Sequence, residues 1–341
     1  MALRVGIVGC GRVIDSHIAA LKKIKDVKLA AVCDLNEELA KQAASNYSID
    51  RFYTDFSELL KEKPNIIHIT TPTQTHLPLS VQAMEAGCHV LIEKPLALTV
   101  DDVDKMAEAA GKNNVCLSVV HNALFVPVIT RVKKLVQSSI IGELLQVEVI
   151  MTGKDTELML NRSHWCHRMQ GGIFGELLPH PLYLAEAFID DLRVVKVNSL
   201  KFGTYEWLEV DEVRIMLEGG NCTASIVCSL NVPDIYCVNF IGTKGYLHVP
   251  VSRGAITSHF PSDKLFIKGL DNVRTSYQWI SATIGMAIKH IFNQSHDGHY
   301  YLIKEFVDAV RKGGEPPVSL ESARNVTKLY QEITNLIPTG K

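Results

Sequence analysis

The feature that most constrains the fold is a short apolar strand that runs directly into a pair of glycines. Residues 3–8 are apolar apart from Arg4, and three of the six are β-branched, which is typical of a buried parallel strand. Gly9 and Gly11 follow at once, and apolar residues then recur at helical spacing, at Ile14, Ile18, Leu21 and Ile24. In such a strand–turn–helix unit, Gly9 permits the tight turn and Gly11 lets the backbone approach a pyrophosphate, which the free N–H groups of the helix start would face. The stretch predicts a phosphate cradle.

A second apolar strand, residues 27–33, ends in Asp34. An acidic side chain roughly 20 residues beyond the glycines can accept hydrogen bonds from the hydroxyls of an adenosine ribose. No Arg or Lys stands at residues 35–38 to receive a 2′-phosphate, so the sequence favours NAD over NADP.

Two residues of the turn, Arg12 and Val13, are assigned to the same cofactor site. The third glycine position of the dinucleotide fingerprint is Ile14, which departs from the usual pattern and predicts a slightly displaced helix. A βαβ unit with an empty turn remains the alternative.

The composition excludes several classes of protein. A chain of 341 residues predicts two domains. The net charge of −2 gives no electrostatic basis for binding nucleic acid or an anionic membrane. Apolar runs fall short of the ~20 residues of a membrane span, and the chain opens directly into a strand, so no signal peptide is expected. The eight cysteines are scattered without CxxC spacing, which favours a reducing cytoplasm.

Residues 1–121 alternate strand and helix, the pattern of a doubly wound parallel sheet. Strands are expected at 3–8, 27–33, 52–53, 66–70, 89–92 and 115–120, and helices at 14–24, 36–44, 55–60, 77–85 and 100–110. Right-handed crossovers place the carboxyl ends of parallel strands at one edge, where ligands bind. Gly9, Asp34, Thr71-Pro72 and Lys94 are therefore expected to share one crevice.

Residues 122–341 are expected to form an α+β domain for substrate binding and oligomerisation, with a mostly antiparallel open sheet. A helix is expected at 125–136, interrupted early by Pro127, and a helical stretch at 171–189. The predicted strands are at 144–151, 194–202, 210–217, 222–230, 236–241 and 246–249, and the chain ends in further helices up to Ile337.

Two surfaces of this second part remain open to interpretation. Small uncharged residues (Thr223, Ser225, Val227 and Ser229) line one sheet face, which suits either cover by another subunit or a small polar solvent face. A stripe of isoleucines (Ile280, Ile284, Ile288 and Ile291) has too few basic neighbours for a membrane-surface anchor. The stripe is read as core or as a subunit contact.

Four groups of residues, in this order along almost the whole chain, resemble the Gfo/Idh/MocA oxidoreductases. They are Gly9-Cys10-Gly11 with His17, Thr71-Pro72-Thr73 with His76, Glu93-Lys94-Pro95, and Gly171-Gly172 leading to Glu176 and His180. The resemblance implies an N-terminal Rossmann domain and an NAD(P)-dependent dehydrogenase acting on a hydroxyl of a sugar, polyol or sugar derivative. It also implies a homodimer or homotetramer.

Lys94 lies at the mouth of a predicted parallel strand, where its charge can orient a substrate hydroxyl and stabilise negative charge as the proton leaves. The resemblance makes Lys94 catalytic and substrate-binding, places Glu93 and Lys94 in the cofactor site, and suggests a cis bond before Pro95. A solvated surface lysine is the alternative.

Glu176 and His180 are four residues apart, which puts them on one face of a helix, although Pro179 interrupts its hydrogen bonding. His180 is the expected proton acceptor, and Glu176 is expected to orient the ring or bind substrate. The family usually has Asp at the position of Glu176, so the longer side chain is a departure. A structural histidine held by local backbone remains possible.

Further residues are assigned to the two sites. Thr71, Pro72, His76 and Asn122 are expected along the cofactor crevice, although Thr71-Pro72 also suits a plain turn and His76, like His17, is treated as a marker of position without a chemical role. Trp165 and Arg168 suit a wall facing a sugar, with interface packing as the alternative. The run from His164 to Arg168 is not expected to bind metal, because no second cluster completes four ligands.

Two other functions compete with a dehydrogenase. Some members of the family use a bound nicotinamide transiently, during glycoside cleavage or group transfer. A non-catalytic NAD-binding sensor is the other alternative, against which the presence of Lys94 and His180 argues.

Overall fold

The computed structural model describes residues 2–291 and 297–338, which form two compact units. The first unit holds residues 2–122 and 297–328, and the second holds residues 123–291 and 329–338. Across the described part of the chain, no helix combines the length and the apolar character that crossing a membrane requires.

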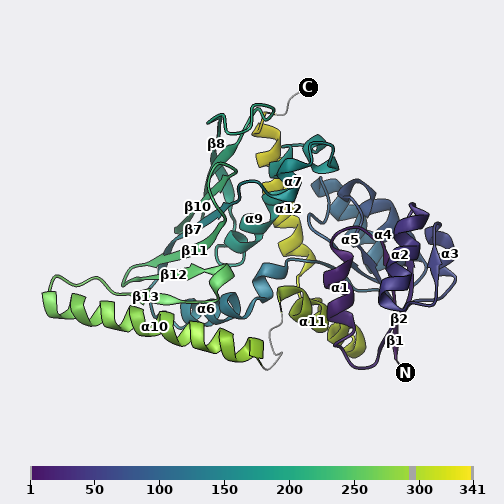
Figure 1. Cartoon of the computed structure of the whole chain (residues 1–341), viewed down its shortest axis with the longest axis horizontal. Helices are drawn as coiled ribbons and strands as arrows, with labels where there is room; N and C mark the ends of the chain where they lie inside the picture. The colour runs from purple at the N-terminus through teal and green to yellow at the C-terminus, as the bar shows by residue number, and fades with distance from the viewer. Residues whose placement is uncertain (1, 292–296, 339–341) are drawn as a thin grey trace. The chain divides into compact units, whose positions relative to one another are not determined.

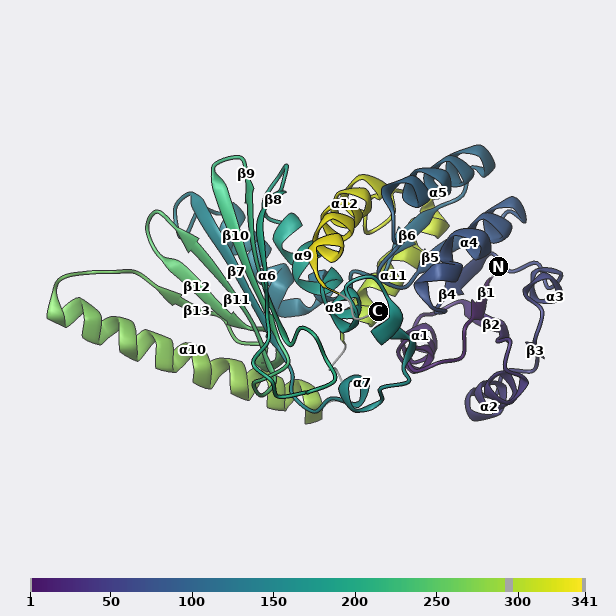
Figure 2. The same cartoon turned by 90° about the horizontal axis from the view of Figure 1, so that it is seen from above.

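The first unit contains a six-stranded parallel sheet in the order β3-β2-β1-β4-β5-β6, which confirms the predicted doubly wound fold. Figure 1 labels β1 and β2 of this sheet, and Figure 2 labels all six of its strands. Its strands are β1 Leu3–Val8, β2 Val27–Cys33, β3 Phe52–Tyr53, β4 Ile66–Ile69, β5 His89–Ile92 and β6 Leu117–Val119. The helices are α1 Ile14–Leu21, α2 Glu37–Tyr47, α3 Phe56–Leu60, α4 His76–Glu85, α5 Val100–Asn113 and α11 Gly298–Lys312. Strands β1, β4, β5 and β6 and the second half of β2 are mostly buried, as their continuous apolar runs predict, whereas the edge strand β3 is partly exposed.

The strand order reverses at β1, which pairs with β2 on one side and β4 on the other. In open α/β sheets, ligands bind beyond the carboxyl ends of the strands at such a reversal. Gly9 follows β1 there, and Thr70 follows β4. The cofactor turn therefore lies at the switch point of the sheet.

The second unit contains a seven-stranded sheet in the order β13-β12-β11-β7-β10-β9-β8 (Figure 2). Its strands are β7 Leu144–Thr152, β8 Arg193–Leu200, β9 Glu212–Gly219, β10 Cys222–Ser229, β11 Ile235–Gly242, β12 Tyr246–Pro250 and β13 Thr257–His259. The β7–β10 pair is parallel and the other neighbours are antiparallel, which confirms the mostly antiparallel sheet. The pattern did not predict β13, which has three residues.

Helices such as α9 cover one face of this sheet (Figure 2). Along β10, Ala224, Ile226 and Cys228 alternate with less buried residues and are themselves buried. On the other face, Thr223 is exposed and Ser225 is half-buried within this chain. The remaining helices of the second unit are α6 Pro127–Gln137, α7 Glu157–Leu160, α8 Ile173–Leu177, α9 Pro179–Glu186 and α10 Leu265–Ile291, and α12 Leu320–Leu336 continues into it from the first unit.

Prolines set two helix boundaries differently from the sequence prediction. Pro127 does not interrupt α6 but begins it, because the first helical position needs no backbone N–H. Pro179 likewise begins α9, so the predicted helical stretch 171–189 divides into α8 and α9 around Leu178. Glu176 therefore lies on α8 and His180 on α9.

The isoleucine stripe lies on α10, a 27-residue helix that runs along β13 (Figure 1). Ile280, Ile284, Ile288 and Ile291 expose 50–75% of their surface. The interpretation of the stripe as core is therefore wrong for this chain, because another face of the helix is turned to the sheet. The subunit-contact interpretation remains.

Candidate active site

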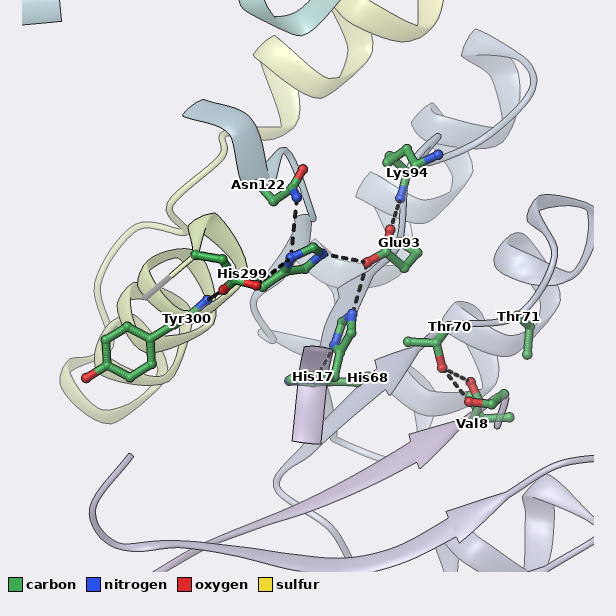
Figure 3. A network of polar contacts seen from close by, with 12 residues as sticks. Val8, His17, His68, Thr70, Thr71, Glu93, Lys94, Asn122, His299 and Tyr300 are labelled. Carbon is green, nitrogen blue, oxygen red and sulfur yellow. Dashed lines mark hydrogen bonds and ion pairs between the residues drawn. The ribbon is translucent and has the colours of Figure 1, made fainter. Parts of the chain in front are cut away.

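The turn after β1 admits only glycine at its first position. Gly9 has φ +100°, and a Cβ there would lie 2.7 Å from the backbone carbonyl carbon of Thr70. The Gly9 N–H donates to the Cys33 carbonyl at 2.8 Å, and the Thr70 hydroxyl lies 2.6 Å from the Gly9 carbonyl and 3.0 Å from that of Val8 (Figure 3). The turn is thus fixed between the ends of β2 and β4.

Asp34 joins the turn to the end of β2. Its Oδ2 accepts from the Cys10 N–H at 2.7 Å, and its Oδ1 accepts from the Asn36 N–H at 2.8 Å. Each carboxylate oxygen has a second lone pair, so the side chain retains acceptor capacity for hydroxyl groups. The carboxylate is half-buried, and an anionic 2′-phosphate beside it would be repelled.

The residues between this carboxylate and α1 present backbone to solvent. A Cβ built on Gly11 would have no heavy atom within 4 Å, and the Arg12 side chain is exposed. Val13, half-buried, immediately precedes α1. Ile14, the departure at the third glycine position, is buried and starts the helix. Together with Asp34, this turn fits the diphosphate and ribose of a dinucleotide.

The segment after β5 is held from two sides. The Lys94–Pro95 bond is cis, as the resemblance suggested. The Lys94 N–H donates to Oε2 of the preceding residue, Glu93, at 3.1 Å. The buried His76 ring lies with Nδ1 3.1 Å from the carbonyl oxygens of Pro95 and Leu96, and with Nε2 2.9 Å from that of Thr71. His76 thus links the Lys94 segment to the turn after β4. Thr71 and Pro72 are half-buried and exposed, respectively.

Glu93 anchors a buried network of histidines that the sequence did not reveal (Figure 3). Nε2 of His17 on α1 lies 2.9 Å from Glu93 Oε1, and Nδ1 of the same ring lies 2.9 Å from Nδ1 of His68 on β4. His299, at the start of α11, places Nε2 3.7 Å from Glu93 Oε1 and Nδ1 3.6 Å from Asp297 Oδ2, both ion-pair distances. His17 is therefore more than a marker of position.

Asn122 joins the same network. Its Nδ2 lies 3.3 Å from Nδ1 of His299, and a Cβ on Gly298 would lie 2.0 Å from the Asn122 carbonyl oxygen. Only glycine fits at the start of α11 at this distance. Asn122 is thus fixed against the helix that brings His299 to Glu93.

The surroundings set the charges of the network. Burial opposes ionisation of Glu93, but the interactions with His17 and His299 outweigh it and hold the pKa of Glu93 well below its usual range. Burial also disfavours the charged form of His299, yet Asp297 and Glu93 together raise its pKa to about 9. Burial and the neighbouring His17 keep the pKa of His68 well below its ordinary value. At neutral pH the buried Glu93 carboxylate thus faces the His299 imidazolium, and the next residue along the chain is Lys94.

In the second unit, His180 has a partner that the sequence analysis missed. Nδ1 of His180 lies 2.7 Å from the Tyr183 hydroxyl, which also accepts from the Ala123 N–H at 3.2 Å. Tyr183 is fully buried, so its ring position is fixed. The i,i+3 spacing on α9 could have indicated this pair.

Glu176 is buried on α8, beside Tyr330 of α12. Burial and then the nearby Glu176 charge raise the pKa of the Tyr330 hydroxyl. A Cβ on Gly175 would lie 3.1 Å from that hydroxyl, so the glycine brings α8 close to α12. Glu176 therefore lies on a packed helix face, as a positioned acid or acceptor requires.

Trp165 and Arg168 begin and end a short 3₁₀ turn, with Trp165 half-buried and Arg168 exposed. A cavity of about 290 Å³ lies near this segment, lined in part by Gly171, Gly172 and Trp207. The Arg162 guanidinium stacks 5.2 Å from the Trp207 ring centroid, and His167 meets the same ring edge-on at 5.0 Å. The sequence did not predict Arg162 or Trp207 as residues near this cavity, because a single Trp in a loop gives little reason to expect a binding role.

No group of three or more His, Cys, Asp or Glu side chains suited to a metal ion occurs in the part of the chain that the structure describes. His164 instead caps the 3₁₀ turn, with Nδ1 3.3 Å from the Cys166 N–H.

Comparison with known proteins adds two matched family models. Residues 3–121 match the model described as an oxidoreductase family with an NAD-binding Rossmann fold, and residues 129–248 match the C-terminal domain model of the same family. The two matches cover most of both units in the order that the motifs predicted.

Curated relatives match over part of their length. Myo-inositol 2-dehydrogenase of Thermotoga maritima is 33% identical over 143 residues, covering 41% of this chain and 42% of the relative. D-glucoside 3-dehydrogenase of Escherichia coli is 31% identical over 144 residues, covering 42% and 41%. An oxidoreductase of Formosa agariphila is 28% identical over 203 residues, covering 58% and 63%. The chain thus spans less than two thirds of the length of each.

Solved structures resemble the chain over nearly all of its length. A levoglucosan dehydrogenase in complex with NADH and levoglucosan has a TM-score of 0.79 at 18% identity, covering 98% of both chains. The WlbA dehydrogenase of Bordetella pertussis, in complex with NADH and UDP-GlcNAcA, has a TM-score of 0.77 at 20% identity, covering 97% and 94%. These similarities establish the fold, and the two matched models confirm the resemblance: the chain belongs to the Gfo/Idh/MocA oxidoreductase family.

Proposed function

We propose that this protein is an NAD-dependent dehydrogenase that transfers a hydride between a CH–OH group of a sugar, polyol or sugar derivative and nicotinamide. One observation in the first unit carries the proposal. Lys94 follows β5 at the sheet edge that also holds the Gly9 turn and Asp34, and its backbone is fixed by Glu93. A cation placed at the mouth of a parallel strand, beside a dinucleotide cradle, suits hydroxyl oxidation.

The cofactor, when bound, supplies the hydride acceptor at its nicotinamide ring. Asp34 would hold the adenosine ribose, the turn would hold the diphosphate, and the residues after β4 and β5 would bound the rest of the molecule. The proposed cofactor set is Gly9, Gly11, Arg12, Val13, Asp34, Thr71, Pro72, His76, Glu93, Lys94 and Asn122. Asp34 and the absence of basic residues at 35–38 support NAD over NADP.

We assign the proton transfer to His180, which takes the hydroxyl proton while Lys94 stabilises the developing negative charge on oxygen. Tyr183 supports this role when its hydroxyl oxygen accepts from Nδ1–H, because Nε2 then carries the lone pair that takes the proton. Glu176 is proposed to orient the substrate or the His180 ring. Trp165 and Arg168 are proposed to face the sugar.

The names of the relatives support the substrate class. The relatives include a myo-inositol 2-dehydrogenase and a D-glucoside 3-dehydrogenase. Among the similar solved structures, a levoglucosan dehydrogenase holds levoglucosan and the WlbA dehydrogenase holds UDP-GlcNAcA. Carbohydrate rings and Trp faces are complementary, which agrees with the aromatic residues near Gly171.

The division at residues 121 and 122 into a cofactor domain and a substrate and oligomerisation domain is part of the proposal. We also place the enzyme in the cytoplasm as a homodimer or homotetramer. Eight free thiols, most of them buried, support a reducing compartment.

The test is nicotinamide absorbance at 340 nm with NAD or NADP across sugars, polyols, sugar acids and nucleotide sugars. Turnover with one ligand class and NAD is expected. NAD binding without net turnover on any class contradicts a dehydrogenase and favours transient redox or a sensor. Retained nicotinamide after denaturing extraction, with product formed but no absorbance change, identifies transient redox.

A further inference from the structure

The helix α10 carries its polar side toward the sheet of its own unit and its apolar side away from it. Gln278 exchanges hydrogen bonds with Ser258 of β13, accepting from its N–H at 3.0 Å and donating to its hydroxyl at 2.9 Å. Arg274 donates to the Ser258 carbonyl and pairs with Asp271 at 2.8 Å. Asp271 in turn lies 3.3 Å from Nδ1 of His259. These contacts fix the rotation of the helix about its axis.

The outer side of α10 has a heptad pattern. Apolar residues alternate at spacings of four and three, and the large ones each expose 53–77% of their surface. They are Phe266, Leu270, Val273, Tyr277, Ile280, Ile284, Ala287 and Ile291. We call these eight residues the α10 seam. A seam with a mean spacing of 3.5 residues is the surface that one helix presents to another in a coiled coil.

The residues flanking the α10 seam exclude a strongly charged partner. They are Gly269, Ser276 and Thr283 on one side, and Ile267, Arg274, Ser281 and Ile288 on the other. Arg274 alone among these seven is charged, and it is bound to Asp271 and Ser258. Two such helices would therefore meet without repulsion between like charges, whereas an anionic membrane surface selects a fringe of lysines and arginines.

The exposed area matches what a stable pair of subunits needs. Seven large apolar side chains, each exposing more than half of its surface, amount to on the order of 800 Å² per chain, the contribution of one partner to a standard interface. A contact between identical surfaces must be self-complementary about a two-fold axis, and a regular apolar seam meets that condition.

We propose that the α10 seam packs antiparallel against the α10 seam of a second copy of this chain. The antiparallel register sets Tyr277 against Ile280 near the two-fold axis, and it sets Leu270, which is large, against Ala287, which is small. It also opposes the two helix dipoles, which a parallel pair would align. This contact rests on the proposed homo-oligomer and names the surface that holds it. It is independent of the proposed enzyme activity, because its occupant is the protein itself and no substrate is involved.

The first test compares Ile280→Asp and Ile284→Asp with Asn272→Asp, an exposed position of α10 outside the α10 seam. Molar mass is measured by light scattering after size-exclusion chromatography, and helix content by circular dichroism. The two seam variants are expected to halve the molar mass with helix content retained, while Asn272→Asp leaves the mass unchanged. Unchanged mass in both seam variants overturns the proposal, as does mass loss in Asn272→Asp to the same extent.

The second test measures register and needs no disrupted interface. Ile280→Cys lies about 4–5 Å along the axis from its symmetry mate, whereas Phe266→Cys lies about 35–40 Å from its own, at 1.5 Å rise per residue. A short bismaleimide is expected to cross-link Ile280→Cys into covalent dimers and to leave Phe266→Cys, like the unaltered chain, largely monomeric on denaturing gels. Equal cross-linking at both positions shows a parallel pair and overturns the proposal. So does binding to anionic vesicles that Ile280→Asp abolishes without any change in mass.

Discussion

Nε2 of His17 lies 2.9 Å from Oε1 of Glu93, and this contact fixes the direction of a buried chain of hydrogen bonds. A carboxylate accepts, so Nε2 of His17 donates and Nδ1 of a neutral His17 accepts from Nδ1–H of His68. His68 Nε2 is then a bare lone pair, consistent with its having no hydrogen-bond partner and with the lowered pKa of His68.

Removing the middle of this chain should therefore destabilise the first unit. We predict that His17→Leu lowers the free energy of unfolding by about 1–3 kcal/mol, the cost of leaving buried polar groups unsatisfied. The measurement is urea unfolding followed by far-UV circular dichroism. The double variant His17→Leu/His68→Leu should recover part of the loss, because it removes one of the orphaned groups. Equal stability of His17→Leu and the unaltered protein would contradict the network.

His299 should make stability depend on pH. Its pKa is raised from the ordinary 6.5 to about 9, because Asp297 and Glu93 outweigh the cost of burial. A raised pKa contributes stability that is complete below pH 6.5 and is lost as the pH rises through about 9. The shift and the ion-pair distances of 3.6 and 3.7 Å correspond to about 1–3 kcal/mol.

The corresponding variant is His299→Gln. The difference in the free energy of unfolding between this variant and the unaltered protein should be largest near pH 6 and should shrink by pH 10. Urea titrations at pH 6, 8 and 10 measure it. If the difference in the free energy of unfolding stays constant over this range, the His299 ring contributes through packing and not through its charge.

Lys94 should separate chemistry from cofactor binding. We predict that Lys94→Ala lowers kcat about 100-fold or more, because a positive charge that stabilises the developing alkoxide is lost. The dissociation constant for NAD, measured by calorimetry, should change little, since Asp34 and the Gly9 turn remain. Weak NAD binding combined with unaltered kcat at saturating NAD would refute the assignment.

Local patterns predicted the cofactor turn because its determinants are adjacent in sequence. The limits of β1 and β2 agree with the expected residues, and the positive φ of Gly9 follows from the turn that joins β1 to α1. The fold class follows equally from the alternation of strands and helices. The family was predictable from four motifs in a fixed order, although no single one of these motifs would establish it.

Long-range contacts account for what the sequence did not predict. His17, His68 and His299 lie on α1, β4 and α11, and only the packing of these elements around the sheet brings His17 and His299 to Glu93 and His68 to His17. The α10 stripe shows the same limit. Its period predicted a helix with an apolar side, but contacts of Gln278 and Arg274 with β13 decide that this side faces outward.

Tyr183 is a third case. From the sequence it looks like an ordinary core residue, but in the structure it supports His180, the candidate base. Its hydroxyl lies 2.7 Å from Nδ1 of His180 and also accepts from the Ala123 N–H. We predict that Tyr183→Phe keeps the ring and the fold but lowers kcat about 10-fold, the range seen when a group that orients an active imidazole is lost. The pH profile of kcat/KM should shift as well, because the environment of the His180 ring changes. Stopped-flow or steady-state assays between pH 5 and 9 measure both effects.

The matched control is Tyr236→Phe, which removes a buried hydroxyl from β11 of the same unit and should leave kcat and its pH profile unchanged. Equal effects of the two substitutions would assign Tyr183 to packing alone.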